Sequence, residues 1–368
     1  MFSVHIIQAE YGDCLLLEFG VEASRGFILI DGGPPMIFDT ALRRVLEGRV
    51  KPQGGQLDRV IVSHVDNDHI VGLIDLLAEL RAQRADGQPE MVSVLGLWHN
   101  SFTRALDPDN TLSPRLRTLL AVAGMETAMN CSAVSINGIA EGNKLRQFAQ
   151  ILEIPLNAGL PDPITVESAS APVSLRNLTL NVVGPTQANL EALRVEWNEW
   201  LDNHEEEIAS GNLGVMANAD KSVPNLSSIC LVAEAEGRTI LLTGDARSDH
   251  VLEGLAAKGL LDASGRVHFD VLKVPHHGSD RNITKTFFRK VTADRYVISA
   301  DGKYGNPDLA TLVWLVEAAK EQNRTPEIFI TNRTQSTRKL VEDYPSSEYR
   351  YQLRFLPESD ASMEVVLA

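Results

Sequence analysis

Two imidazoles and two carboxylates occupy six consecutive positions of this chain. They are His64, Asp66, Asp68 and His69. Residues 58–63, before this motif, have the apolar composition of a strand, and residues 70–80, after it, have the apolar spacing of a helix. A loop between a strand and a helix can bring side chains from both elements to one point. The pattern therefore indicates a metal site, although a helix capped by aspartate beside two incidental histidines would also fit it.

The composition is that of an ordinary soluble globular protein. The chain is 44% hydrophobic and 23% charged. Its length of 368 residues is sufficient for one large domain or two. There is no run of 18 apolar residues and no basic start followed by an apolar segment, so we expect neither a membrane span nor a signal peptide. Three scattered cysteines give no disulfide framework. These features predict a cytoplasmic protein without a membrane partner.

The net charge of −15 disfavours nonspecific attraction to a polyanion. The charge is unevenly distributed, because residues 273–354 contain 14 basic and 10 acidic side chains. A local basic face in this part of the chain would fit these numbers, but a solvated surface of mixed charge is the simpler interpretation.

Strands and helices are expected in both halves of the chain. The apolar patterns predict strands at 2–8, 13–19, 26–30, 59–63, 91–98, 173–175, 178–183, 228–235, 239–242, 268–274 and 296–299. They predict helices at 38–46, 70–80, 114–123, 141–152, 186–209, 246–258, 283–290 and 309–320. Two groups of strands with helices outside them predict an α/β fold, a four-layer αββα sandwich.

We expect residues 1–368 to form a single domain. Within it, residues 186–224 are predicted to be an insertion, with an acidic amphipathic helix at 186–209 and a loop at 210–224. Residues 325–368 are predicted to be a C-terminal extension that ends in an edge hairpin of strands 349–355 and 363–367.

The second half also places polar side chains at the ends of strands. Gly244-Asp245 ends one apolar strand, and the segment 276–279 (His-His-Gly-Ser) ends the next. The segment 225–228 (Asn-Leu-Ser-Ser) opens the strand that precedes both. These side chains are partners of the right chemical type for the ligand-type residues of the first half.

Taken in chain order, these motifs resemble the metallo-β-lactamase superfamily. The motifs that carry the resemblance are His64-x-Asp66-x-Asp68-His69, Gly244-Asp245 and His276-His277-Gly278-Ser279. Segments 8–13, 29–33 and 304–307 are similar to the hydrolase domain of ComEC-like DNA-uptake proteins, although that branch often has histidine at the position of Asn306. The resemblance spans roughly residues 4–314 and implies the metallo-β-lactamase fold.

The resemblance also implies a centre with two divalent ions. The ligands of one ion would be His64, Asp66 and Asp245, and those of the other Asp68, His69, Asp245 and one of His276 and His277. Asp66 stands where many members have histidine, and oxygen ligands favour harder ions, so Mn²⁺ follows closely after Zn²⁺ as the expected metal. Two such ions would activate water as a bound hydroxide and clamp the attacking and leaving oxygens.

The adjacent histidines cannot easily serve one ion, because consecutive side chains of an extended chain point in opposite directions. His277 is favoured as the ligand because it precedes Gly278, as the ligand precedes a glycine in related enzymes, and the reverse assignment is the alternative. His276 would then transfer a proton to the leaving oxygen, with Asp68 as the other catalytic residue.

Three further side chains are predicted to contact an anionic substrate. They are Lys273, Ser279 and Ser228. A lysine near a strand end is more often structural, which is the alternative for Lys273. His99 and Asn100 end a strand and fit either the cleft or the surface.

The fold alone does not identify the substrate, because a metal-activated hydroxide can attack phosphodiesters, thioesters, lactones or β-lactams. The resemblance and the oxygen-rich metal site favour a phosphodiesterase or nuclease acting on single-stranded nucleic acid, nucleotides or small phosphodiesters. One alternative is a metallohydrolase of a carboxylic ester, thioester or lactone. The other is a metal-binding scaffold without catalysis, and a protein partner could dock on residues 325–368.

Overall fold

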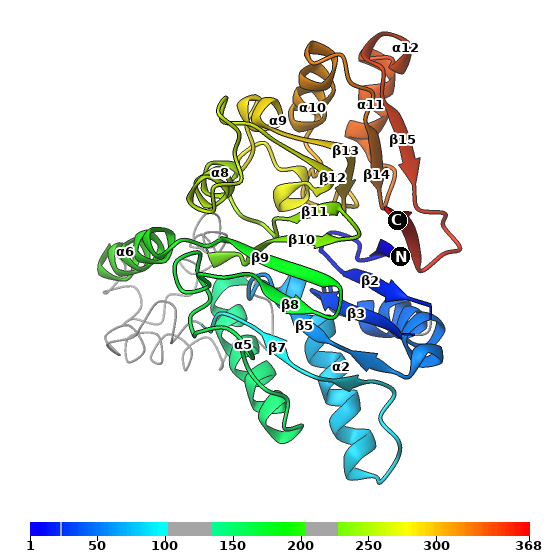
Figure 1. Cartoon of the computed structure of the whole chain (residues 1–368), viewed down its shortest axis with the longest axis vertical. Helices are drawn as coiled ribbons and strands as arrows, with labels where there is room; N and C mark the ends of the chain where they lie inside the picture. Colours follow the sequence, from blue (N-terminus) through cyan, green and yellow to red (C-terminus); the bar gives the residue numbers. More distant parts are fainter. Residues whose placement is uncertain (23, 102–133, 204–226) are drawn as a thin grey trace.

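The computed structural model describes residues 1–22, 24–101, 134–203 and 227–368. Two sheets of six and eight strands pack face to face, and helices cover their outer faces (Figure 1). A further two-stranded sheet pairs β4 (Gln56–Leu57) with β6 (Ser93–Val94). The architecture is the α/β four-layer αββα sandwich that the sequence predicts.

The six-stranded sheet has the order β16-β1-β2-β3-β5-β7. Its strands are β1 (Phe2–Ile7), β2 (Leu15–Val21), β3 (Ser24–Ile30), β5 (Arg59–Ile61), β7 (Leu97–Trp98) and β16 (Ser362–Val366). β1, β2 and β3 form an antiparallel meander, whereas β3, β5 and β7 run parallel. The carboxyl ends of the parallel strands therefore meet at one edge, where Asp31 and the segment 64–69 follow.

The eight-stranded sheet has the order β15-β14-β13-β12-β11-β10-β9-β8. Its strands are β8 (Val173–Leu175), β9 (Leu178–Gly184), β10 (Cys230–Ala235), β11 (Arg238–Leu242), β12 (Val267–Lys273), β13 (Val291–Ile298), β14 (Glu327–Ile330) and β15 (Gln352–Phe355). Neighbours from β8 to β11 are antiparallel and those from β11 to β15 are parallel. Asp245 and the segment 276–279 follow β11 and β12.

Three apolar clusters lie between the four layers. Alternate residues of a strand point to opposite faces, so in β1 Val4 enters the cluster between the sheets and Ile7 the cluster under the helices. Leu231 of β10 meets the middle cluster from the other sheet, and Val232 faces the opposite helical layer. Strands covered on both faces read as continuous apolar runs, which explains the composition of β1 and β2.

Helices of both halves supply the outer layers. They are α2 (Asn67–Ala85), α5 (Val134–Ile151), α6 (Gln187–Asn203), α8 (Ser248–Ala257), α9 (Lys285–Lys290), α10 (Leu309–Glu321), α11 (Gln335–Asp343) and α12 (Ser346–Tyr349), with helical segments Phe38–Leu42, Arg43–Val45 and Leu46–Val50. In α2, buried Ile70, Leu73, Leu77 and Leu80 recur every three or four residues and face the first sheet. α2 and α5 lie on one side of the molecule in Figure 1, and α8 to α11 on the other.

The predicted edge hairpin at the end of the chain is wrong. β15 pairs in parallel with β14 and forms an edge of the eight-stranded sheet. β16 pairs antiparallel with β1, with Val365 opposite Val4, and forms an edge of the six-stranded sheet. The segment between them therefore crosses from one sheet to the other, and the last two strands complete both layers.

Other boundaries also differ from the expectations. The strand predicted at 91–98 is divided into β6 and β7, while β14 and α11 were not predicted. The helix predicted at 114–123, the end of the one at 186–209 and the loop at 210–224 lie outside the described residues. The single-domain organisation stays a prediction. None of the helices in the described ranges has both the length and the apolar character to cross a membrane.

Candidate metal centre

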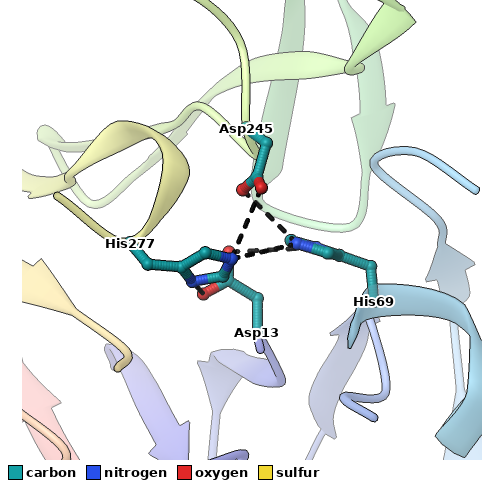
Figure 2. A group of neighbouring side chains, drawn as sticks. All are labelled: Asp13, His69, Asp245 and His277. Carbon is teal, nitrogen blue, oxygen red and sulfur yellow. Dashed lines mark hydrogen bonds and ion pairs between the residues drawn. The ribbon is translucent and has the colours of Figure 1, made fainter. Parts of the chain in front are cut away.

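A compact group of acidic and imidazole side chains lies where the polar strand ends of both sheets meet. His69 comes from the start of α2, Asp245 from the turn after β11, and His277 from the turn after β12. Asp13, between β1 and β2, joins them from below, and all four are buried (Figure 2). One atom of each lies within 4.8 Å of one atom of every other member.

The imidazoles of His69 and His277 are oriented in the same way. His69 donates from Nδ1 to Asp31 Oδ2 at 2.9 Å, and His277 donates from Nδ1 to the carbonyl oxygen of Ser299 at 2.9 Å. Both rings therefore direct Nε2 into the centre, where the two Nε2 atoms are 3.3 Å apart. A hydrogen bond at Nδ1 that leaves Nε2 as an electron-pair donor is the usual arrangement of metal-binding histidine.

The spacing of the facing atoms fits a tetrahedral ion. Asp245 Oδ1 is 3.3 Å from His69 Nε2, and Asp245 Oδ2 is 3.4 Å from His277 Nε2. Asp68 Oδ2 is 3.5 Å from His277 Nε2. Ligand atoms about 2.0–2.2 Å from a tetrahedral ion are roughly 3.3–3.6 Å apart. The donor set that was predicted for the second ion is thus brought together, with Asp68 somewhat farther from His69, at 3.9 Å between Oδ1 and Nε2.

A second group of donors adjoins the first. His64 Nε2 is 3.6 Å from Asp66 Oδ2 and 3.8 Å from Asp245 Oδ2. Three atoms of this group are buried and make no hydrogen bond within the described part of the chain: His64 Nε2, Asp66 Oδ1 and Asp245 Oδ1. Buried polar atoms without a partner are costly unless something outside the chain satisfies them. A cation fits that need, and Asp245 faces both groups.

The structure also decides against the capping interpretation of the motif. Asp66 occupies the N-cap position of α2, but its side chain makes no capping hydrogen bond. The carboxylate instead faces His64.

The charges of the centre attract a cation. Burial by itself lowers the pKa of His69, but Asp245 and other facing carboxylates outweigh burial and hold that pKa well above its usual range. The same balance raises the pKa of His277. Burial by itself raises the pKa of Asp245, but His277 and His69 outweigh it and hold the pKa well below its usual range. The carboxylates thus favour protons on these imidazoles, and a divalent ion can take the place of those protons.

The turn that carries His276 and His277 is not extended. Both residues have a left-handed backbone conformation, with φ of 44° at His276 and 52° at His277. The argument that their side chains must point in opposite directions is therefore wrong, because it assumed extended backbone. His276 Nε2 approaches Asp245 Oδ2 at 3.5 Å, close to the 3.4 Å of His277. Of the two rings, His277 is the one that lies against His69, which supports it as the ligand. Left-handed backbone at two non-glycine residues costs of order 1–3 kcal/mol each and is typical of functional sites.

Comparison with known proteins agrees with this geometry. Residues 9–126 match the family model described as the metallo-beta-lactamase superfamily. Over these residues the chain is similar to metallo-β-lactamase superfamily domains. The closer resemblance to ComEC-like hydrolase domains stays a prediction. No curated protein matches the chain.

One solved structure to which the chain is similar is titled a new diphosphatase from the PhnP family. The two chains are 10% identical, with a TM-score of 0.40, and the alignment covers 100% of this chain and 98% of the other. At that score the similarity carries no argument about activity.

Two residues of the matched segment 9–126 hold the centre together and were not predicted. Asp31 accepts hydrogen bonds from Ser63 N at 2.7 Å and Ser63 Oγ at 2.6 Å, in addition to the one from His69. Asp13 lies behind the rings, with Oδ1 3.4 Å from His277 Nδ1, and forms an ion pair with Lys273. Asp13 stands before β2 and Asp31 directly after β3, both in segments that carried the resemblance. That position was the only signal in the sequence that they could contact the centre.

Lys273 was predicted to contact the substrate, but its side chain is buried beneath the centre. Its side chain is 2% exposed, and Nζ donates to the carbonyl oxygen of Gly244 at 2.9 Å. An ammonium buried against Asp13 and 3.6 Å from Asp245 Oδ1 neutralises carboxylates beneath the centre and has no surface left for a substrate.

The two serines are also buried. Ser228 Oγ accepts a hydrogen bond from Asp245 N at 3.2 Å, so it positions the backbone of that residue. Ser279 N donates to the carbonyl oxygen of His276 and closes the left-handed turn. Their predicted contact with substrate is untested.

The end of β7 is buried as well. His99 is 1% exposed, and burial lowers its pKa to about 3. Asn100 is held by two hydrogen bonds to the backbone of Ile164. The structure therefore places neither residue at the surface.

We expect Asp31→Ala to weaken metal binding about 10- to 100-fold, because partners that orient a ligating histidine typically contribute that much to affinity. The His69 ring would lose its Nδ1 partner, and Ser63 N would lose its acceptor. Competition with a chromophoric chelator measures the affinity. Asp39→Ala, at an exposed carboxylate, is the control. An affinity unchanged within threefold would contradict the role assigned to Asp31.

Proposed function

We propose that this hydrolase-superfamily domain is a metal-dependent phosphodiesterase, with nucleotides or single-stranded nucleic acid as its substrates. The observation that carries the proposal is Asp245, whose two oxygens face both donor groups, at 3.3 Å from His69 and 3.8 Å from His64. A carboxylate between two donor sets is typical of two-ion sites that act on phosphoryl groups.

The charge of the proposed site supports an anionic substrate. Three ligand carboxylates would face two divalent ions, at Asp66, Asp68 and Asp245. Of the other two carboxylates, Asp13 is paired with Lys273, and Asp31 keeps its charge behind the His69 ring, where it accepts three hydrogen bonds. The two ions would therefore carry one positive charge more than the three carboxylates that contact them, which favours a phosphodiester over a neutral ester or lactone.

The donor set fits two ions, with Zn²⁺ and Mn²⁺ as the candidates. His64, Asp66 and Asp245 would hold one, and Asp68, His69, His277 and Asp245 the other. When bound, such ions supply Lewis-acid activation of water and neutralise charge on phosphoryl oxygens. Asp31 and Ser299 hold the imidazoles in place, so the centre needs little rearrangement to bind metal.

His276 is the most exposed side chain among the residues of the candidate metal centre. Its side chain is 26% exposed, whereas those of His69 and His277 are almost completely buried. Its Nε2 lies 3.5 Å from Asp245 Oδ2, at the border of the centre. From there the imidazole would hold or transfer the proton of the leaving oxygen, with Asp68 positioned beside His277 on the other side.

The decisive experiment measures bound metal and hydrolysis on the same preparation. The substrates are an aryl phosphodiester, single-stranded DNA, an aryl ester and a lactone, each with Zn²⁺ and with Mn²⁺. The matched control is Asp68→Ala combined with His69→Ala. The proposal is supported if the wild type hydrolyses phosphodiesters and the double variant does not. If the wild type acts on esters or lactones only, the ester-hydrolase alternative replaces the proposal. If the wild type binds metal but hydrolyses none of the substrates, the scaffold alternative replaces it.

We expect His276→Ala to lower kcat about 10²- to 10⁴-fold on a phosphodiester with an alkoxide leaving group, the usual contribution of acid–base catalysis. The loss should be much smaller with p-nitrophenolate, which leaves without a proton. Initial rates on the two substrates measure the difference, and metal content serves as the control. An equal loss on both would mean that His276 acts on the metal centre and not on the leaving group.

A further inference from the structure

Two tyrosines and a lysine form a cluster at the surface beside the metal centre. The rings of Tyr11 and Tyr304 meet edge to face, with centroids 5.4 Å apart at 89°. Lys303 Nζ lies 3.6 Å from the centroid of Tyr11 and 5.3 Å from that of Tyr304. Tyr304 is 68% exposed, so most of its ring faces solvent. An aromatic ring held at the surface by a second ring is a ready-made stacking face.

Both backbone segments that carry this cluster also hold the metal centre. Tyr11 and Gly12 precede Asp13, whose backbone N–H donates to the carbonyl oxygen of Asp68 at 3.1 Å. Ser299, the acceptor for His277, donates from Oγ to the carbonyl oxygen of Gly12. The chain then continues directly to Lys303 and Tyr304. The stacking face is therefore positioned by the same residues that position the proposed ligands.

The loop after Tyr304 rests on the turn that carries the histidines. Asp308 N donates to the carbonyl oxygen of Gly278 at 3.0 Å, and Pro307 packs so closely that a Cβ at Gly278 would lie 2.8 Å from it. Tyr11, Tyr304 and Asn306 line a shallow hollow together with residues 300–302.

The charge of Lys303 is not neutralised by an anionic side chain within the described part of the chain. No carboxylate there forms an ion pair with its Nζ. A second cluster of the same type shows the contrast, because Lys320 lies over Tyr349, 4.3 Å from its centroid, but pairs with Glu348 at 2.8 Å. Tyr349 is also partly buried against the core. The tyrosines and lysine beside the metal centre thus offer an exposed ring and an unneutralised cation, which the distant cluster does not.

We propose that Tyr11, Lys303 and Tyr304 form a subsite that binds the nucleobase next to the scissile phosphoester. The base stacks on Tyr304, which Tyr11 supports from its edge, and Lys303 contacts the adjoining phosphate. This inference rests on the proposed phosphodiesterase function and names its substrate class as nucleobase-bearing phosphoesters. Stacking on aromatic side chains is tolerant of base identity and does not depend on an overall positive charge, which suits a chain of net charge −15.

The first test compares two substrates with the same leaving group. Thymidine 5′-(p-nitrophenyl phosphate) carries a base, and methyl p-nitrophenyl phosphate does not. The wild type should have a higher kcat/KM on the thymidine ester, and Tyr304→Leu should reduce that preference about tenfold, mainly through KM, because one stacked base typically contributes that much or more. Tyr349→Leu, in the distant cluster, should leave the preference unchanged. An unchanged preference in Tyr304→Leu would overturn the subsite.

The second test does not depend on hydrolysis. Anisotropy in EDTA measures binding of labelled oligothymidylate and of an abasic chain of the same length. Tyr304→Leu should weaken binding of the oligothymidylate about tenfold and leave the abasic chain unaffected, whereas Lys303→Gln should weaken both. Competition by thymidine 5′-monophosphate identifies single nucleotides as ligands, and lack of competition identifies a strand.

The two tests separate the failure of each proposal. If the wild type hydrolyses neither p-nitrophenyl ester but binds oligothymidylate through Tyr304, the phosphodiesterase function fails and the base subsite stands. If both esters are hydrolysed with no dependence on Tyr304, the function stands and the subsite fails. Equal binding of oligothymidylate and abasic chain by the wild type would also overturn the subsite.

Discussion

Asp245→Asn should reduce bound metal from two ions per chain to one or none and lower phosphodiesterase activity about 10³-fold or more, because each ion contributes several kcal/mol to the transition state. The amide keeps the shape of the side chain but removes its charge. Among the described residues, Asp245 is the carboxylate that faces His69, His64 and His277 together, at 3.3, 3.8 and 3.4 Å. Elemental analysis gives the stoichiometry, and initial rates give the activity.

A loss of folding must be separated from a loss of metal in this variant. Thermal unfolding in EDTA compares the metal-free proteins and should show a much smaller change than activity does. Asp294→Asn, at a carboxylate that is 60% exposed and pairs with Arg324, is the matched control and should keep both ions. Retention of two ions and near-normal activity by Asp245→Asn would show that this residue does not bridge.

Gly72→Ala should lower the free energy of unfolding by about 1–3 kcal/mol or more, the usual cost of overfilling a packed site. A Cβ at Gly72 would lie 2.0 Å from the carbonyl oxygen of Gly32, a backbone atom that cannot move alone. Gly32 N donates to the carbonyl oxygen of His69 at 2.7 Å, and Gly72 N to that of Gly33 at 3.1 Å. Separating these segments would also move His69 away from Asp31, so metal affinity should fall too.

Gly48→Ala is the matched control for this substitution. Gly48 lies in the helical segment Leu46–Val50, and a Cβ there would meet nothing within 4 Å. Alanine in an open helical position should stabilise the protein by up to about 1 kcal/mol. Chemical denaturation measures both variants. Equal effects at the two positions would show that α2 is not held in place by the close contact with Gly32.

The residues of the candidate metal centre were largely predictable because they belong to local motifs at strand ends. His64, Asp66, Asp68 and His69 stand together in the sequence, and the structure places all four at the centre. Asp31 was not predicted to contact the centre, because no property of its neighbours shows that the turn after β3 will meet the start of α2. That meeting depends on the close packing of Gly32 against Gly72.

The pairing of the histidines shows a second limit. Whether His276 and His277 face the same carboxylate depends on backbone angles, and an apolar strand followed by two histidines does not specify left-handed φ. The turn is set by long-range contacts, such as the hydrogen bonds from His276 N to Gly244 O and from Asp308 N to Gly278 O.

The sequence by itself determined the layered α/β class, most of the strands and helices, and the types of side chain at the candidate metal centre, because alternation, helical spacing and short motifs are local properties. Only the tertiary structure decided which strands pair, since β16 joins β1 across almost the whole chain. It also decided that Lys273 lies beneath the centre, and that the six-residue motif surrounds Asp245 together with His277. Contacts between distant segments follow from how the whole core packs, and no local pattern encodes them.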